Sequence, residues 1–355
     1  TRWQESGFFN PDNLSGEPFT IVFPPPNVTG ILHNGHALEH SLMDTIIRYQ
    51  RMCGKKTLLL PGTDHAAVAT QAKVEGMLMK EGVADPRKTL GRDGLIEKIR
   101  TFAEGSKESI ISQVKKMGSS ADWSRLAYTF DDKRSEAVNE AFLRMYNDGL
   151  IYRGHRVIHW SVKGQSTCSE DELEMVERTA ALYTFTYSAD FPIPISTTRP
   201  ETKFGDTAVA VHPKDSRYAQ YIGQVISVRF CGVDLQIKVI GDEHVDPHFG
   251  TGALGVTPAH SHIDFEIYER QKAKEDPIDL IQVIGEDGLL MDCAGSFAKK
   301  DVVSAREQVV AQLRKDGLLT KEEEVRQHVA THGRFKDVVE PLPKTQWFVA
   351  VNKKI

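Results

Sequence analysis

The sequence has few of the features that mark membrane, secreted or disulfide-rich proteins. Its 355 residues include 4 cysteines, which are widely scattered, and aromatic residues make up 8%. No uninterrupted apolar run approaches the ~18 residues that a membrane-spanning helix needs, and no apolar stretch follows the N-terminus as in a secretory signal. A disulfide framework is not expected in so large a chain. We therefore expect reduced thiols and a cytoplasmic location.

An excess of charge of one sign is also missing. The chain carries 44 Lys+Arg against 49 Asp+Glu, a net charge of −5. This neither supports nor excludes a nucleic-acid partner, because net charge can hide a local basic face. Hydrophobic residues at 40% and charged residues at 26% are typical of globular proteins, and the length suggests two or three domains. The chain begins with Thr1 and ends without a natural stop signal, so we expect both ends to be cut.

Local patterns predict an α/β beginning. Residues 19–23 form a β-branched and aromatic run, and apolar residues recur at helical spacing over residues 38–53. A second apolar strand is expected at residues 57–60. Strand, helix and apolar strand in this order are the unit of a parallel sheet.

The texture changes further along the chain. Residues 91–150 are expected to be largely helical, whereas short strands separated by turn residues are expected from about residue 183 onward. The expected strands are residues 183–187, 208–211, 225–228 and 235–240. A helix is expected near residues 302–315, and the charged run at 321–324 is expected to be a solvated face or a linker.

A short polar motif lies between the first strand and its helix: His33, Asn34, Gly35 and His36. Gly35 lets the backbone come close to a ligand, and a helix N-terminus offers free N–H groups and partial positive charge to a phosphate. Two imidazoles can donate to phosphate oxygens as charge builds in a transition state. The same residues are also typical of a helix cap or a solvated turn, and both interpretations stay open.

Longer strings give this motif a context. In chain order they are PPPNVTGILHNGHALEHS (24–41), LLLPGTDHAAVATQ (58–71), GSSADWSRLAYTFDDKRSEAV (118–138), TTRPET (197–202), GTGALGVTPAH (250–260) and EPLPKTQWFV (340–349). They are colinear and resemble the valyl-tRNA synthetases, a family of class I aminoacyl-tRNA synthetases. The Gly-Thr-Asp-His at 62–65 resembles the valine enzymes, since isoleucine and leucine relatives usually carry Trp in place of Thr63.

The resemblance implies an α/β fold, with a Rossmann-type nucleotide-binding catalytic half-domain interrupted by an inserted β-rich editing domain. We expect the first half of the catalytic domain at residues 1–172, the editing domain at 173–328 and a return segment toward the catalytic domain at 329–355. In such enzymes the amino-acid carboxylate attacks the α-phosphate of ATP, Mg²⁺ accompanies the nucleotide, and the aminoacyl group passes to tRNA. The expected partners are valine, ATP and tRNA(Val), with no membrane, and the expected state is a monomer.

The resemblance assigns roles to two sets of residues in the first segment. The catalytic, ATP-phosphate set is His33, Gly35 and His36. The valine-pocket set is Pro25, Asn27 and Asp64. Asp64 would be the counter-ion of the substrate ammonium, because a buried ammonium needs an anionic partner. The alternative for Asp64 is a cap of the helix that starts near residue 66.

Editing is expected because a hydrophobic valine pocket cannot strongly reject threonine, an isostere with a hydroxyl; this family is the standard example of that limit. The resemblance places the editing pocket at Arg199, Thr202, Phe249, Thr257 and Asp264, with Asp264 binding the ammonium of the misattached threonine. The alternative is that these strings are scaffolding. Relatives usually carry Lys at the position of Gly255 and Asp at that of Ser261, so we expect weakened hydrolysis, restored by Gly255→Lys with Ser261→Asp.

Several family features are missing or altered. The signature Lys-Met-Ser-Lys-Ser and an anticodon-binding domain do not occur in these residues, so we expect this piece to fold without activating valine. Relatives usually carry an apolar residue at the position of Asn34, Gly at that of Ala67 and Asn at that of His159. The stretches 161–164 and 332–335 lack the paired cysteines of some relatives, so no metal site and no structural zinc are expected. A free-standing tRNA deacylase and a non-catalytic tRNA-binding paralogue remain alternatives.

Overall fold

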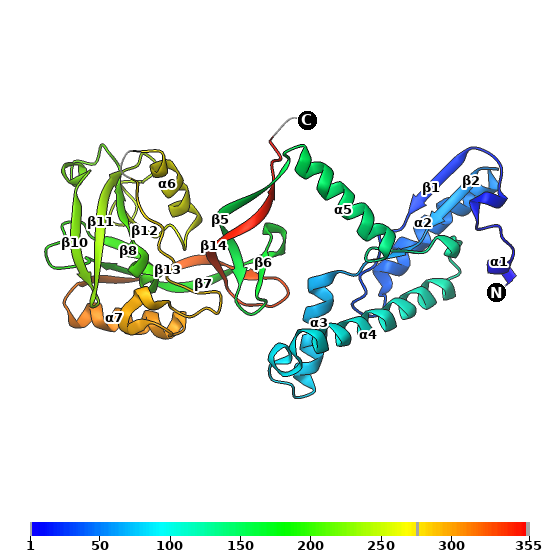
Figure 1. Cartoon of the computed structure of the whole chain (residues 1–355), viewed down its shortest axis with the longest axis horizontal. Helices are drawn as coiled ribbons and strands as arrows, with labels where there is room; N and C mark the ends of the chain where they lie inside the picture. The colour runs from blue at the N-terminus through cyan, green and yellow to red at the C-terminus, as the bar shows by residue number, and fades with distance from the viewer. Residues whose placement is uncertain (1, 275–276, 353–355) are drawn as a thin grey trace. The chain divides into compact units, whose positions relative to one another are not determined.

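The computed structural model describes residues 2–274 and 277–352 (Figure 1). The chain divides into two compact units, one that ends at Ile151 and one that covers Tyr152–Asn352. Within the described residues no helix is long and apolar enough to cross a membrane. The domain limits at 172 and 328 stay a prediction.

The first unit is built on a parallel pair of strands. β1 (Pro18–Val22) pairs with β2 (Lys56–Leu60), and Pro18 lies opposite Lys56. Parallel strands need a crossover connection, and α2 (Asn34–Met52) supplies it and packs on both strands. The predicted strand, helix and strand are confirmed.

Helices make up most of the rest of this unit, as predicted. Its other elements are α1 (Arg2–Glu5), η1 (Pro11–Asn13), β3 (Gly62–Thr63), α3 (Ala67–Lys80), α4 (Pro86–Lys116), η2 (Trp123–Arg125), β4 (Ala127–Tyr128) and α5 (Asp132–Asn147). The helices α3 and α4 lie side by side (Figure 1). α4 contains a kink at Gly91, whose φ of 64° is favourable for glycine. β4 pairs in parallel with β3, which brings the segment after residue 126 next to Thr63.

The apolar spacing that predicted α2 does not mark its buried face. Leu38, Leu42, Ile46 and Tyr49 are 64%, 59%, 46% and 59% exposed, whereas Ile47 is 0% exposed. Ile47 packs instead with Phe23, Leu59, Val114 and Ala121. The apolar spacing therefore predicts the helix correctly, but it does not predict which face of α2 is buried in the first unit.

The second unit is β-rich, as predicted, and contains three small sheets. Its strands are β5 (Ile151–Ser161), β6 (Ser166–Cys168), β7 (Leu173–Phe185), β8 (Ile195–Thr197), β9 (Ala208–Val211), β10 (Val225–Phe230), β11 (Val233–Gly241), β12 (Ala253–Val256), β13 (Leu319–His332) and β14 (Val339–Val349). Its helices are η3 (Glu170–Glu172), η4 (Pro200–Gly205), η5 (Ala219–Tyr221), α6 (His262–Lys272), η6 (Asp292–Phe297) and α7 (Val302–Lys315). The strand orders are β10-β11-β9-β12, β13-β7-β8 and β14-β5-β6.

The four-stranded sheet of this unit is covered on both faces. Side chains alternate between the faces of a strand, and in β9 Ala208 and Ala210 belong to the core formed with Ile267 of α6. Val209 and Val211 belong to the larger core, which includes Val309 and Leu313 of α7. This explains why β9 reads as an unbroken apolar run.

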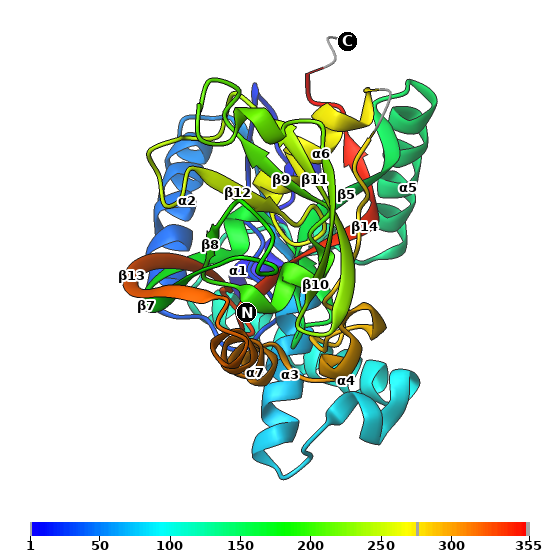
Figure 2. The same ribbon diagram turned by 90° about the vertical axis from the view of Figure 1, so that its left-hand side faces the viewer.

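The charged run at 321–324 lies in a strand and not in a linker. It belongs to β13, which pairs antiparallel with β7 over most of its length (Figure 2). Residues 321–324 are exposed, so the alternative of a solvated face is the one that holds.

Candidate functional site

The loop after β1 ends at a histidine that caps α2. His33 is the N-cap residue, and its Nδ1 accepts the backbone N–H of Gly35 at 3.1 Å. The Nδ1 of His36 in turn accepts the backbone N–H of His33 at 3.3 Å. A Cβ on Gly35 would lie 2.9 Å from the His33 ring, so the capping ring leaves no room for a side chain there. His33 therefore is a helix cap, which was one of the two interpretations of this motif.

The cap also leaves one nitrogen of each ring free to donate. Because each Nδ1 accepts a backbone N–H, each neutral ring carries its proton on Nε2. The two ring centroids are 4.0 Å apart, and His33 and Gly35 are exposed while His36 is half-buried. Two N–H donors are thus held next to a helix N-terminus, which is a favourable place for phosphate.

The structure also brings the three predicted valine-pocket residues together. Asn27 and Asp64 face each other in a parallel bridge, and the N–H of Val28 donates to the Asp64 carbonyl at 2.9 Å. Pro25 lies against Gly62, at 3.6 Å from the position of a Cβ there. This is the edge beyond the carboxyl ends of β1 and β2, where ligands bind in open α/β sheets.

Asp64 is not a helix cap, so that alternative is wrong. The N-cap of α3 is Ala66, which makes no side-chain cap. The Asp64 carboxylate instead accepts the hydroxyl of Thr129 at 2.7 Å. Within the described residues the other Asp64 carboxylate oxygen has no hydrogen-bond partner, and the side chain is half-buried.

Sequence reasoning missed the segment that holds Asp64 and its neighbour His65 in place. Thr129 also accepts the backbone N–H of His65 at 2.9 Å, Tyr128 lies 2.6 Å from His65 Nδ1, and Phe130 stacks on the His65 ring at 4.7 Å. These residues lie within one of the family-like strings, at 118–138, so the string itself was the available signal. The tertiary contact was not visible in it.

In the second unit, four of the five predicted editing residues lie within two buried polar clusters, and Phe249 does not. Arg199 pairs with Glu340 and Glu201, and Glu201 also receives a two-pronged contact from Arg306 at 2.7 and 2.8 Å. Glu201 is 0% exposed. The carboxylates Glu340 and Glu201 raise the pKa of Arg199 despite the opposing effect of burial. Thr202 donates its hydroxyl to the Arg199 carbonyl at 3.0 Å.

Thr257 and Asp264 belong together. The Asp264 carboxylate accepts the backbone N–H of Thr257 at 2.8 Å, and Asp264 is 5% exposed. Burial raises the pKa of Asp264 to about 6. The side chain of Phe249, by contrast, is 76% exposed, and it takes no part in this cluster.

A lysine that sequence reasoning overlooked lies beside Gly255. The ammonium of Lys203 donates to the Gly255 carbonyl at 2.9 Å, to the Thr257 hydroxyl at 2.8 Å and to Asp206 at 3.2 Å. Asp206 also accepts the hydroxyls of Thr257 and Tyr187. Burial raises the pKa of Asp206, and Lys203 opposes that rise. A buried cation from position 203 therefore lies beside position 255, where relatives usually carry Lys.

Gly255 has no space for a lysine. A Cβ there would lie 2.6 Å from Asp206, 2.7 Å from the Tyr187 hydroxyl and 2.8 Å from Ile195. These contacts argue against the expectation that Gly255→Lys with Ser261→Asp raises hydrolysis, because the lysine adds a second cation and a steric clash to an occupied cluster. Ser261 has a structural role as well, since it is the N-cap of α6 and accepts the Asp264 N–H at 3.3 Å.

The first unit is thus a parallel α/β unit with anion donors at a helix start, and the second is a β-rich unit with buried ion clusters. The model of the family described as "tRNA synthetases class I (I, L, M and V)" matches residues 1–354, so the chain belongs to this family. The predicted family and the predicted fold class are confirmed.

The chain is similar to curated valine–tRNA ligases. It is 45% identical to that of Parasynechococcus marenigrum over 351 residues and 44% identical to that of Carboxydothermus hydrogenoformans over 350 residues. Each match covers 98% of this chain but only 37% and 39% of the relatives, so the chain spans less than two fifths of their length. A solved ternary complex, LeuRS–tRNA–LeuAMS of Agrobacterium radiobacter, is 17% identical with a TM-score of 0.41, covering 96% of this chain and 48% of that one; this likeness is too low to carry an argument.

Proposed function

We propose that the chain is the part of a valine–tRNA ligase that binds valine and the ATP phosphates and that carries the editing unit. The observation that supports this most is the meeting of Pro25, Asn27 and Asp64 beyond the carboxyl ends of β1 and β2. The exposed apolar face of α2, with Leu38 and Leu42, suits a surface that further chain covers in a longer protein.

In this proposal Asp64 binds the ammonium of valine and so positions its carboxylate for attack on the α-phosphate of ATP. Thr129 holds the Asp64 carboxylate by its hydroxyl at 2.7 Å, which fixes the orientation that positioning requires. The Nε2–H groups of His33 and His36 donate to phosphate oxygens whose negative charge increases in the transition state. Mg²⁺ accompanies the nucleotide as part of the substrate. The carboxylate–phosphate bond forms while the bond to pyrophosphate breaks.

The proposed second activity is hydrolysis of threonyl-tRNA in the second unit, with tRNA(Val) as the partner of the ligase. Asp264, held at Thr257, is proposed to bind the ammonium of the misattached threonine, while water attacks the ester. Arg199 and Thr202 line the proposed pocket, and Phe249 is exposed at its margin. Lys203 stabilises the cluster beneath Thr257, so the chain keeps a cation there.

The alternatives are a free-standing deacylase and a non-catalytic tRNA-binding paralogue. Valine-dependent ATP–pyrophosphate exchange by the complete gene product separates them from the ligase. Exchange supports the ligase, whereas its absence together with hydrolysis of threonyl-tRNA supports the deacylase. Absence of both activities with retained tRNA binding supports the paralogue.

Thr129→Val in the complete gene product gives a sharper test of the valine pocket. It removes a hydrogen bond to a charged group, which is worth about 1.5–3 kcal/mol, so we expect KM for valine to rise roughly 10–100-fold with little change in KM for ATP. Thr101→Val is the matched control, because the Thr101 hydroxyl only donates to the Glu97 carbonyl within α4. An unchanged KM for valine in Thr129→Val would refute the assignment of Asp64.

A further inference from the structure

Some relatives carry four paired cysteines at positions that fall together in the second unit. Here these positions are Ser161, Gly164, His332 and Phe335. A Cβ on Gly164 would lie 2.5 Å from the Phe335 ring and 2.7 Å from the Ser161 hydroxyl, so a buried ring fills the space between the two stretches. The Ser161 hydroxyl donates to Asp337 at 2.9 Å. Since only His332 has a zinc-binding side chain, a four-thiolate zinc site does not fit this chain.

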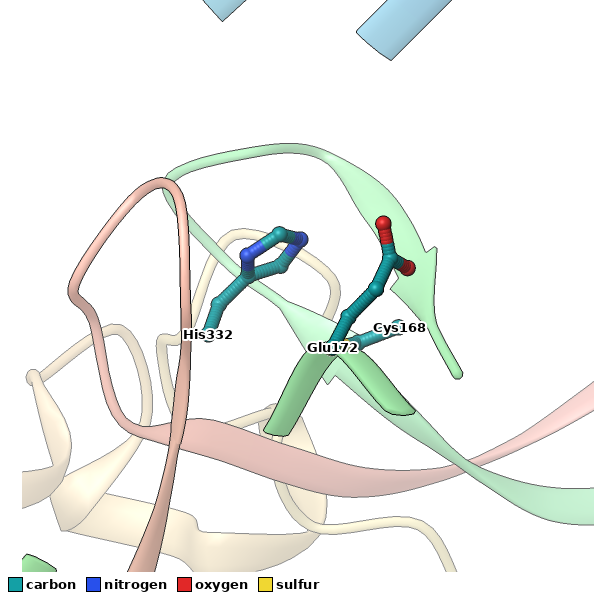
Figure 3. A group of neighbouring side chains, drawn as sticks. All are labelled: Cys168, Glu172 and His332. Atoms are coloured by element: carbon teal, nitrogen blue, oxygen red, sulfur yellow. The ribbon is translucent and has the colours of Figure 1, made fainter. Parts of the chain in front are cut away.

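A different set of ligands lies beside His332. Cys168 ends β6, Glu172 ends η3 and His332 ends β13, and each places one ligand atom within 4.8 Å of the other two. Figure 3 shows the outer nitrogen of the His332 ring facing the Glu172 side chain, with Cys168 next to Glu172. Thiolate, carboxylate and imidazole are all common zinc ligands, so the residue types suit one borderline-soft cation.

His332 is the observation that points to a missing ligand. The residue is 0% exposed, and its Nε2 has no hydrogen-bond partner. Its Nδ1 accepts the backbone N–H of Arg334 at 3.1 Å, which leaves the neutral ring with a buried N–H on Nε2 that meets no acceptor. Buried polar groups without a partner are rare in folded proteins and call for an explanation such as an ion.

The charges of the ligands also suit a divalent cation, because one thiolate and one carboxylate balance its two positive charges. Glu172 is already held in place, because its carboxylate accepts the Ser169 N–H at 3.2 Å and contacts Arg334 at 3.3 Å.

We propose that Cys168, Glu172 and His332 form a divalent-metal site that binds Zn²⁺, with a solvent molecule as a further ligand. On binding, the Cys168 thiol releases its proton to solvent, and the ring proton of His332 moves from Nε2 to Nδ1 as Nε2 bonds to the metal. The protonated Nδ1 can no longer accept the Arg334 N–H, so the metal bond replaces that hydrogen bond and the turn after β13 adjusts. No oxidation state changes. The site fastens the turn after β13 to the segment after β6, and it replaces the earlier expectation that this chain holds no structural zinc. It does not depend on the proposed enzyme activity.

Metal titration of the full chain tests the proposal. After treatment with EDTA and removal of the chelator, Co²⁺ is added while absorption is recorded, and Zn²⁺ is then added in competition. We expect one metal ion per chain, with a thiolate-to-cobalt charge-transfer band in the near ultraviolet that Zn²⁺ abolishes. Cys168→Ser should remove the band, and Glu172→Gln should weaken binding at least about tenfold. Cys293→Ser is the control, because Cys293 is a half-buried thiol outside the cluster, and it should bind as the unmodified chain does.

A second measurement uses no substitution, so its result does not depend on whether a variant folds. In the unmodified protein, bound Zn²⁺ should protect Cys168, and not Cys53, from alkylation as read by mass spectrometry, and should raise the thermal midpoint. The proposal is overturned if the unmodified chain binds neither metal at micromolar concentration, if Cys168 is alkylated equally with and without Zn²⁺, or if Cys293→Ser loses the cobalt band as Cys168→Ser does.

Discussion

The two histidines at the start of α2 and the buried cluster around Lys203 differ in what their polar atoms are bonded to. His33 and His36 bond only to the backbone of their own helix turn, and each keeps one ring nitrogen free to donate. Lys203, Asp206 and Thr257 bond to one another and are almost fully buried. The first arrangement is ready for a ligand, whereas the second already satisfies itself. Substitutions should therefore change the reaction rate at the first and stability at the second.

The largest expected effect is on stability, from Lys203→Met. The side chains of Lys203 and Asp206 are 7% and 0% exposed, so the substitution leaves a buried carboxylate without its cation. We expect the free energy of unfolding in urea to fall by about 3–5 kcal/mol. The control is Arg229→Met, whose pair with Asp234 is 69% and 75% exposed, with an expected loss below about 1 kcal/mol. Equal losses in the two variants would show that burial does not decide the difference.

Two adjacent isoleucines of α2 test the same contrast between a buried and an open side chain. Ile47 is 0% exposed and Ile46 is 46% exposed. Ile47→Ala leaves a cavity against Phe23 and Leu59, and we expect it to lower the free energy of unfolding by about 2–5 kcal/mol. Ile46→Ala, as the matched control, should cost less than about 1 kcal/mol. Urea unfolding of both variants measures this, and a reversed order would mean that the other face of α2 packs on the sheet.

The pH dependence of stability offers a third test. The pKa of Asp264 in the folded chain is about 6, above the ~3.9 of an unfolded chain, so the folded state takes up a proton first as pH falls. Asp264 therefore adds stability as pH falls from about 6, by roughly 2 kcal/mol at pH 4. Asp264→Asn should lose that gain. The stability of the unmodified chain minus that of the variant, from urea unfolding, should rise by this amount between pH 7 and pH 4.

His260 has the opposite pH effect and must be separated from Asp264. Burial lowers the pKa of His260 to about 3, aided by the charges of Arg199 and Lys203, and its Nε2 accepts the N–H of Val283 at 2.7 Å. Because its folded pKa lies below the unfolded one, stability is lost as pH falls from about 6.5 to about 3. The comparison of Asp264→Asn with the unmodified chain cancels this contribution. Asp234→Asn, at an exposed site, should match the unmodified chain within about 0.5 kcal/mol at both pH values.

The smallest expected effect separates the two roles of His33. Asn is a good N-cap, so His33→Asn keeps the cap of α2 but removes the Nε2–H donor. In the complete gene product we expect ATP–pyrophosphate exchange to slow by at least about tenfold, or 1.4 kcal/mol, with the thermal midpoint nearly unchanged. His33→Ala should slow exchange equally and also lose about 1 kcal/mol of stability. Exchange at the unmodified rate in His33→Asn would leave the histidine as a cap only.

The sequence predicted the elements of the fold better than their surroundings. The β1–α2–β2 unit and α7 follow from local apolar patterns, since hydrophobic period and turn residues act over a few neighbours. The burial of Ile47, the clash at Gly255 and the role of Lys203 could not be predicted in this way. Each depends on side chains from distant segments. Lys203 also lies just outside the string at 197–202, so no motif pointed to it.

The sequence by itself determined the family and the order of elements, and it predicted which residues form the two candidate sites, because motif strings and local periodicity are properties of short segments. The tertiary structure alone decided that Asp64 is held by Thr129 instead of capping a helix, and that the Lys203 ammonium lies against the Gly255 carbonyl. It also decided that Cys168, Glu172 and His332 meet. Hydrogen bonds, ion pairs and metal ligation act over a few ångströms in space, and only the folded chain brings residues so far apart in sequence within that distance.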